Sequence, residues 1–384
     1  MNFSEKLNMI IKEFYEGNKN LAYKKFKKIY LQNNKNIKLR FNLAVMQHEL
    51  GLLDEAETNY LSLINNDKNN KYKINLYKIY IIKGDYRKAL EVIDSINLRN
   101  VNLIQVSQDK AYLLYLLKNF SFSINECNQI LKIDDKNISA LNTLGLCLLS
   151  LQRYKDANLV LLKALEINEN NIKVLNSLGR LNHELRDSKK AEIYFNKALK
   201  LNPNTFETLN NMAGFYLEES KYDKAITFFK KGEQLNPKNA VLLNNLAKTF
   251  ICINKIDEAE KYCKKAILID QKNDEFKKTL SLILLKRYDF KNAWLYFDGR
   301  LSLSEFFGKN PTLELVKNKI PKNDKINKNS KILVLREQGV GDEILYGTMY
   351  HDLLNNFSNV KIECDERLIP LFKNSFKNEN QFFK

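Results

Sequence analysis

Small side chains return along most of this chain at a nearly constant interval of about 34 residues. The positions are Ala22, Ala56, Ala89, Ser123, Ala157, Ala191, Ala225, Ala259 and Ala293. An apolar residue follows four positions after each of them, at Phe26, Tyr60, Ile93, Cys127, Leu161, Phe195, Phe229, Cys263 and Phe297. Within each interval the apolar residues follow the i, i+3, i+4 spacing of a helix with one buried face. The interval therefore predicts a stack of about nine helical hairpins.

The first helix of each expected hairpin carries a second set of small residues. Gly145, Gly179, Ala213 and Ala247 occupy one position and predict a close approach to the paired helix. We expect the alanines of the second helix, such as Ala157 and Ala191, to make the same contact from the other side. Pro203 and Pro237 fall between hairpins, where a helix must stop.

This pattern resembles the tetratricopeptide-repeat family over residues 3–305, and most clearly over residues 138–273. The resemblance implies a mainly α fold, a right-handed superhelix whose first helices line the concave side and hold another molecule. Two residues depart from the family pattern: Ser123 replaces the usual alanine, and Lys110 stands where a leucine is expected. We expect these departures to affect the local register and not the architecture.

The sixth position of the first helix is rich in asparagine. It holds Asn8, Asn42, Asn75, Asn211 and Asn245, with Thr143, Ser177, Thr279 and Asp109 at the other repeats. An asparagine amide has one acceptor and two donors, so a row of them can bind an extended peptide backbone. The row resembles the asparagine ladder of the O-linked N-acetylglucosamine transferases, and it predicts a peptide-binding groove. The alternative is that asparagine is common in this chain and is selected here only for facing solvent.

The basic composition raises the alternative of nucleic-acid binding. The chain has 62 Lys and Arg against 45 Asp and Glu, a formal net charge of +17. The lysines are spread over helix faces and not collected in one block, which is typical of a solvated surface. We therefore rank nucleic acid below protein as a partner.

The cysteines, histidines and apolar runs bear on location and on metals. Five cysteines without a CxxC pair lie within apolar patterns and indicate small core residues in a reducing compartment. No apolar run reaches the ~20 residues of a membrane span, and the N-terminus lacks a signal-peptide pattern. We expect a cytoplasmic chain without membrane contact. His48, His183 and His351 lie far apart in the sequence and predict no metal site.

The pattern changes near the C-terminus. Residues 306–330 are polar and read as a linker. After them we expect a strand at 331–335, a helix at 343–356, a strand at 360–364 and a helix at 366–375. Strand–helix–strand–helix order predicts the beginning of a doubly wound, Rossmann-like parallel sheet. The predicted domains are therefore a repeat array (1–305), a linker (306–330) and a partial α/β segment (331–384).

A glycine-containing loop joins the first strand and helix of this segment. It contains Glu337, Gln338, Gly339, Gly341 and Asp342. A loop of this kind, at a helix N-terminus, suits anions. With the preceding AWLYFDGR, the string EQGVGDEI resembles bacterial proteins in which tetratricopeptide repeats precede a heptosyltransferase-like glycosyltransferase of the two-Rossmann type. The resemblance implies an acceptor loop with Asp342 as general base, while the local reading of Asp342 is a helix N-cap.

The resemblance to a glycosyltransferase covers only residues 290–378. The second Rossmann domain, which holds most of the nucleotide-sugar in such enzymes, has no counterpart in this sequence. Our first hypothesis is therefore a peptide- or protein-binding scaffold, the recruiting part of a glycosyltransferase whose catalytic domain is truncated. The alternatives are an active glycosyltransferase fragment and a basic nucleic-acid-binding solenoid. We expect no cofactor in this chain, and a nucleotide-sugar donor only for a complete enzyme.

Overall fold

The computed structural model describes residues 3–66, 70–96, 103–297, 329–334, 344, 347–376 and 381–383. The chain divides into two compact parts, residues 1–211 and residues 212–384. The division falls inside a helix of the seventh repeat, whereas the boundaries expected at 305 and 330 follow changes of sequence pattern. Those boundaries stay a prediction.

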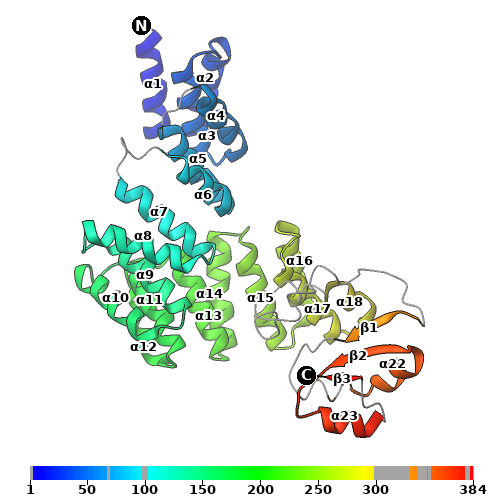
Figure 1. Cartoon of the computed structure of the whole chain (residues 1–384). Coiled ribbons are helices and arrows are strands. Elements are labelled where there is room, and N and C mark those ends of the chain that lie inside the picture. Colours follow the sequence, from blue (N-terminus) through cyan, green and yellow to red (C-terminus); the bar gives the residue numbers. More distant parts are fainter. Residues whose placement is uncertain are drawn as a thin grey trace. The chain divides into compact units, whose positions relative to one another are not determined.

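Eighteen helices of the described chain between residues 3 and 297 form nine consecutive hairpins, drawn from blue to yellow in Figure 1. The first helices of the hairpins are α1 (Phe3–Glu16), α3 (Ile37–Glu49), α5 (Asn70–Lys83), α7 (Leu103–Leu116), α9 (Ile138–Ser150), α11 (Ile172–Glu184), α13 (Phe206–Glu218), α15 (Ala240–Cys252) and α17 (Asp274–Lys286). The second helices are α2 (Lys19–Gln32), α4 (Leu53–Asn66), α6 (Tyr86–Asp94), α8 (Phe120–Ile133), α10 (Tyr154–Ile167), α12 (Ser188–Leu201), α14 (Tyr222–Leu235), α16 (Ile256–Ile269) and α18 (Phe290–Phe297). The predicted repeat architecture is confirmed over these residues.

The periodic small residues lie in the core of the hairpins. All nine, from Ala22 to Ala293, have no exposed surface. The glycines of the first helices allow the close approach of the paired helix, as expected, and they face its large residue four positions after the alanine. A β-carbon on Gly145 would lie 2.5 Å from Leu161 Cδ2, and one on Gly179 would lie 2.5 Å from Phe195 Cε1. The closest approach therefore pairs a glycine with a large side chain.

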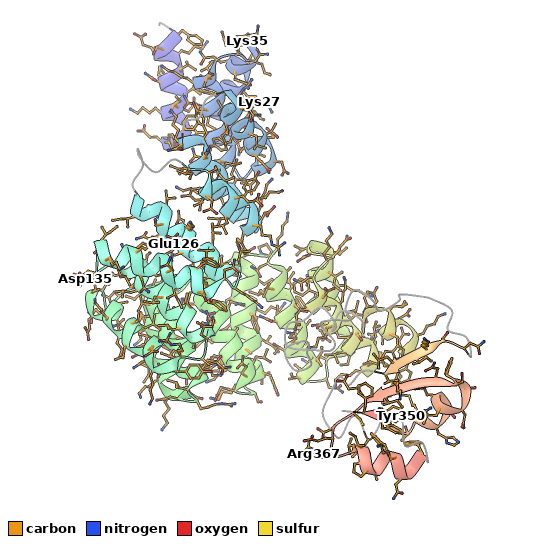
Figure 2. All side chains as sticks on the ribbon, viewed as in Figure 1. Lys27, Lys35, Glu126, Asp135, Tyr350 and Arg367 are labelled. Atoms are coloured by element: carbon orange, nitrogen blue, oxygen red, sulfur yellow. The ribbon has the colours of Figure 1, made fainter. Side chains whose placement is uncertain are left out.

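The two departures from the repeat pattern keep the register. The Ser123 hydroxyl is buried and donates to the Ala111 carbonyl oxygen at 2.7 Å, and it accepts from Cys147 Sγ at 3.1 Å. Serine can replace alanine here because its hydroxyl has both partners. Lys110 forms ion pairs with Asp94 (3.1 Å) and Glu126 (3.0 Å), the latter labelled in Figure 2. Its ammonium therefore connects the third and fourth repeats.

The turn inside eight of the nine hairpins uses a left-handed residue that sequence reasoning did not identify. It is glycine in the second and third repeats (Gly51 and Gly84) and a non-glycine residue in the next six: Lys118, Gln152, Arg186, Ser220, Asn254 and Tyr288. In the sixth repeat, Arg186 N–H donates to the His183 carbonyl (2.9 Å) and Asp187 N–H to the Asn182 carbonyl (2.8 Å). These bonds close the helix end as in a Schellman motif. Few glycines are needed at this turn position because the turn accommodates non-glycine residues in the left-handed backbone conformation.

The C-terminal segment contains a parallel sheet, as expected, with one more strand than predicted. Strands β1 (Lys331–Val334), β2 (Asn359–Glu363) and β3 (Phe382–Phe383) lie in the order β1-β2-β3. Val334 pairs with Ile362, and Ile362 pairs with Phe382. Helix α22 (Tyr350–Asn356) precedes β2, and helix α23 (Ile369–Phe376) precedes β3. The strand β3 was missed because a two-residue strand leaves no periodicity to read.

An aromatic cluster forms the core of this sheet segment. The Tyr350 ring lies 5.4 Å from the Phe372 ring, 5.9 Å from Phe376 and 5.9 Å from Phe382, measured between centroids. Figure 2 shows Tyr350 among the side chains of the segment. The buried Asp365 accepts two hydrogen bonds from the Arg367 guanidinium, at 2.8 and 3.0 Å, after β2. The cluster joins both helices to the third strand.

The cysteines are core residues with one exception. Cys127, Cys147, Cys263 and Cys364 are buried, but Cys252 is exposed at the end of α15. The expectation that all five lie in the core is therefore wrong for Cys252, because it falls at the last turn of its helix, beyond the packed stripe. Burial raises the pKa of the Cys127 and Cys263 thiols to about 12 and also raises the pKa of Cys147.

We expect Gly179→Ala to lower the free energy of unfolding by about 1–3 kcal/mol, because the added methyl meets the buried Phe195 ring. The matched control is Gly214→Ala, whose methyl would enter open space in α13. That control should raise stability by about 0.5–1 kcal/mol through helix propensity. Urea unfolding followed by circular dichroism measures both. Shifts in the same direction would contradict this account of hairpin packing.

Arg186→Gly should raise the free energy of unfolding by about 1 kcal/mol, because Arg186 has φ of 63° and glycine adopts this conformation without strain. Arg186→Ala retains the β-carbon and should bring no such gain. Thermal unfolding of the two variants beside the parent protein distinguishes strain relief from loss of the side chain.

Native protein at neutral pH should expose one rapidly reacting thiol to Ellman's reagent, at Cys252. The buried thiols should react only after unfolding, because a raised pKa and lack of access both suppress thiolate attack. Cys252→Ser should abolish the fast phase. A fast phase that persists in this variant would show that a helix pair opens readily.

Candidate functional site

Several first helices of successive repeats contact one another within each compact part. In residues 1–211, α3 contacts α5, α7 contacts α9, and α9 contacts α11; in residues 212–384, α15 contacts α17. Figure 1 shows α9 and α11 lying side by side. We call the surface of the first helices the first-helix face. It is where the sequence places the sixth-position asparagines.

The five sixth-position asparagines have free amides. Asn8 is exposed, and Asn42, Asn75, Asn211 and Asn245 are half-buried. Hydrogen-bond partners for these side chains are absent among the described residues, whereas many other asparagines of the chain are bonded. The four half-buried amides are partly shielded from water, and their donors and acceptors are therefore available to a ligand.

The other members of the sixth position are used internally. Thr143, Ser177 and Thr279 are buried, with at most 6% of each exposed. Ser177 Oγ donates to Asn142 Oδ1 at 2.8 Å, which joins α11 to α9. Asp109 accepts from the Tyr77 hydroxyl at 2.8 Å, which joins α7 to α5. Ser177 and Asp109 thus link repeats and Thr143 is buried, so the row is interrupted between Asn75 and Asn211.

Asparagines at the fifth position form a second row that sequence reasoning missed. Asn142, Asn176 and Asn244 are buried, and Asn210 is half-buried. Asn176 Nδ2 donates to Thr208 Oγ1 of the next repeat at 2.9 Å. The Oδ1 atoms of Asn176, Asn210 and Asn244 are buried without a hydrogen-bond partner among the described residues. The constant interval of 34 residues was the signal that could have revealed them.

Asparagine also caps the first helices, which explains part of its abundance. The side chains of Asn36, Asn137, Asn171, Asn239 and Asn273 accept from backbone N–H groups at the starts of α3, α9, α11, α15 and α17. Such bonds satisfy donors that a helix start leaves open. The capping position thus accounts for many asparagines, but the sixth position makes no comparable bond.

Helix α9 is enclosed on all sides. Every residue from Ala140 to Leu149 is buried, including Asn142 and Leu146. Its neighbours are α8 and α10 as well as α7 and α11, and Gln108 Nε2 of α7 donates to Asn137 Oδ1 at 2.7 Å. An apolar helix of this kind needs cover on every face, and these four helices provide it.

Tyr112 of α7 is partly exposed, with 42% of its side chain accessible to solvent. Even so, burial of the hydroxyl, with help from the charge of Glu207, raises its pKa to about 12; Arg180 acts in the opposite direction. Tyr112 therefore lies within electrostatic range of α11 and of α13, two and three repeats further along the chain.

Arg180 and Glu207 are both unpaired. Arg180 is half-buried and Glu207 is exposed, and ion-pair or hydrogen-bond partners for their side chains are absent among the residues that the structure describes. The Tyr115 ring stacks on Tyr112 with centroids 6.0 Å apart and an interplanar angle of 28°. This combination of a guanidinium, a carboxylate and two phenol rings was not predicted from the sequence.

The predicted acceptor loop lies outside the described residues. This holds for Glu337, Gln338, Gly339, Gly341 and Asp342, so their roles stay predictions. Within the described stretches, no group of three or more His, Cys, Asp or Glu side chains could hold a metal ion. The same stretches contain no helix with the length and apolar character needed to cross a membrane.

Two family profiles, each described as tetratricopeptide repeat, match the chain. One matches residues 138–171 and 172–205, and the other matches residues 216–283. A search of the curated proteins found no significant match. The profile matches fall within the region in which the sequence pattern was strongest.

Solved structures show the same fold. A tetratricopeptide repeat protein from Parabacteroides merdae is 20% identical, with a TM-score of 0.51 over 65% of this chain and 98% of its own. Cut9, solved in the hetero-tetramer Cut9-Hcn1 of APC/C, is 14% identical, with a TM-score of 0.52 over 79% of this chain and 59% of the other.

Human IFIT1, solved as a dimer with m7Gppp-AAAA, is 16% identical. Its TM-score is 0.51 over 70% of this chain and 68% of its own. At these identities the likeness concerns the fold alone. Residues 138–205 and 216–283 of this chain are thus tetratricopeptide repeats, within a helical array that shares its fold with other proteins built from such repeats.

Proposed function

We propose that this chain is a scaffold that binds an extended peptide segment of a protein partner on its first-helix face. The observation that carries the proposal is the set of free, half-buried amides at Asn42, Asn75 and Asn211 in residues 1–211; Asn245 offers the same group in residues 212–384. A backbone offers alternating donors and acceptors, which an amide can match without reading side chains. The repeat fold supports a role in protein interaction.

The structure of the row limits how a peptide would lie. Asn42 and Asn75 occupy α3 and α5. At the following positions, Asp109 and Ser177 are hydrogen-bonded within the protein and Thr143 is buried. We infer that the backbone of a bound peptide contacts the asparagine amides in separate stretches. Between these stretches the peptide would contact side chains other than the sixth-position asparagines. Free amides are expected to contribute roughly 0.5–1.5 kcal/mol per hydrogen bond gained.

Asn211→Ala and Asn245→Ala should each weaken peptide binding about 3- to 10-fold, with little change in melting temperature, since a lost hydrogen bond contributes about 1 kcal/mol. The probe is a peptide selected by the parent protein from a phage-displayed library of random 12-residue sequences. Fluorescence anisotropy measures its dissociation constant. The matched control is Asn196→Ala, which removes an exposed amide from a second helix. Equal affinities for all three variants would reject the ladder.

A second candidate is sugar transfer from a nucleotide-sugar by the complete form of a glycosyltransferase. The observation that favours it is the parallel β1-β2-β3 sheet, with a helix before β2 and another before β3. Parallel strands with crossover helices form nucleotide-binding folds. Titration calorimetry with a panel of nucleotide-sugars tests it, and heat of binding lost in Asp342→Asn would support a role for that loop. Absence of binding would leave the scaffold as the function of these residues.

A further inference from the structure

Acidic residues are absent from a long stretch of the first two repeats. Residues 17–48 contain seven lysines and one arginine but no aspartate or glutamate. The stretch covers α2, the turn after it and all of α3 except its last residue. Lysine is common along the whole chain, so the missing counter-charges distinguish this stretch more than the lysines do. Its positive charges are neutralised by acidic residues from other parts of the chain, or they stay open.

Neighbouring helices neutralise part of this charge. Three of the five lysines of α2 form ion pairs with acidic side chains: Lys19 with Glu49 (3.3 Å), Lys25 with Glu13 (2.8 Å) and Lys27 with Glu55 (3.6 Å). Figure 2 labels Lys27. Lys24 and Lys28 are exposed and have no ion-pair partner in the part of the chain that the structure describes. The fold therefore leaves two of the five charges open.

The open lysines of α2 share one helix face with two exposed leucines. Leu21, Lys24, Lys28 and Leu31 are spaced by three or four residues, which places them in one row along the helix. We call these four residues the α2 stripe. Leu21 is 46% exposed and Leu31 is 64% exposed, whereas Phe26 on the opposite side has no exposed surface. The α2 stripe is therefore a surface of open charge and apolar side chains that the core does not use.

Lys35 extends the positive charge past the end of the helix. It lies in the turn after α2, is exposed, and is labelled in Figure 2. Like Lys24 and Lys28, it has no ion-pair partner among the described residues. Two lysines four residues apart disfavour a helix, so the charges of the α2 stripe do not stabilise α2.

Helix α16 shows that the arrangement is not general among the second helices. It has lysines at the same two repeat positions, Lys261 and Lys265. There, Glu258 takes the place of Leu21, and Lys265 pairs with Glu233 at 3.8 Å. The same lysine pattern is thus balanced by acidic residues in α16 and open in α2.

We propose that the α2 stripe and Lys35 form a docking surface for an acidic amphipathic helix of a partner protein. Carboxylates on that helix pair with the three open ammonium groups, and its apolar side chains cover the two leucines. Leu21 and Leu31 are ten residues apart, about 15 Å along a helix, so the partner helix needs about three turns. Because α2 is a second helix, this inference goes beyond the proposed function of the first-helix face and does not rest on it.

The side chains of the α2 stripe favour a protein over other anionic partners. Single-stranded nucleic acids stack their bases on aromatic rings, and the stripe has no ring. Arg40, the one arginine of the stretch, already donates to the Tyr30 hydroxyl at 2.9 Å and to the Asn34 carbonyl at 3.0 Å. A helix that lies on a membrane buries a broad apolar face in lipid, but the apolar face of α2 packs in the protein core. Lysines flanked by leucines match carboxylates flanked by apolar residues.

The experiment uses the full chain and a phage-displayed library of random sequences of about 16 residues, long enough for a helix of about four turns. Peptides are selected on the parent protein and counter-selected on the double variant Lys24→Glu/Lys28→Glu. We expect enriched sequences with several aspartates or glutamates between apolar residues. By fluorescence anisotropy, the double variant should bind them at least about 10-fold more weakly, with a smaller loss at high salt. Leu21→Ser should weaken binding about 3- to 10-fold at low and at high salt.

The matched control is the double variant Lys261→Glu/Lys265→Glu, which changes the same positions of α16 and should leave the affinity unchanged. Replacing the acidic residues of a selected peptide with lysine should restore its binding to Lys24→Glu/Lys28→Glu. Circular dichroism of each variant confirms that the helices are retained. Equal losses in the two double variants would show attraction to the overall positive charge and would overturn the inference.

The outcomes also separate this inference from the proposed function. Asn211→Ala should not change the affinity for these peptides. Enrichment of no sequence that depends on Lys24 and Lys28 would reject the docking surface and leave the first-helix face as proposed. An oligothymidylate, or a vesicle of phosphatidylcholine and phosphatidylserine, that binds more tightly than any selected peptide and is lost in Lys24→Glu/Lys28→Glu would equally reject it.

Discussion

The nesting of the two helices of each repeat is the constraint on which the rest of the structure depends. Nine small residues at one position have no exposed surface, and glycines of the partner helix face large side chains such as Leu161 and Phe195. Packing a small residue against a large side chain keeps the interior filled while the two helix backbones approach closely. The fourth repeat obeys the same rule with Ser123, whose hydroxyl is bonded to the Ala111 carbonyl. Packing therefore requires a small side chain at this position, even in the repeat where that side chain is polar.

Close hairpins bring the first helices of neighbouring repeats together, and this decides which polar groups remain available. Near α9 the approach is tight enough to bury Thr143 and Asn142, so hydrogen bonds are made between repeats. Asn42, Asn75 and Asn211 lie where the approach is looser, and their amides remain open. One sequence position thus serves as an internal link in some repeats and as a binding surface in others, according to local enclosure.

The sequence predicts the repeats well because a local pattern that is weak by itself recurs at a constant interval along the chain. The buried alanines, the turn prolines Pro203 and Pro237, and the first strand of the sheet could all be placed. Features that depend on distance across repeats could not. The hydrogen bond from Asn176 to Thr208 of the next repeat, for example, depends on how neighbouring hairpins pack, which no periodicity encodes. The exposure of Cys252 was missed because the last turn of an apolar helix can leave the core.

The net charge of the chain says less about function than the pairing of individual charges. Several lysines of the second helices form exposed ion pairs, for example Lys163 with Asp135 at 3.5 Å and Lys197 with Glu169 at 3.8 Å. Such pairs contribute little to stability and carry no information about a ligand. The half-buried Arg180 guanidinium is different, because it has no ion-pair partner among the described residues. The net charge therefore describes the surface as a whole and does not identify a ligand.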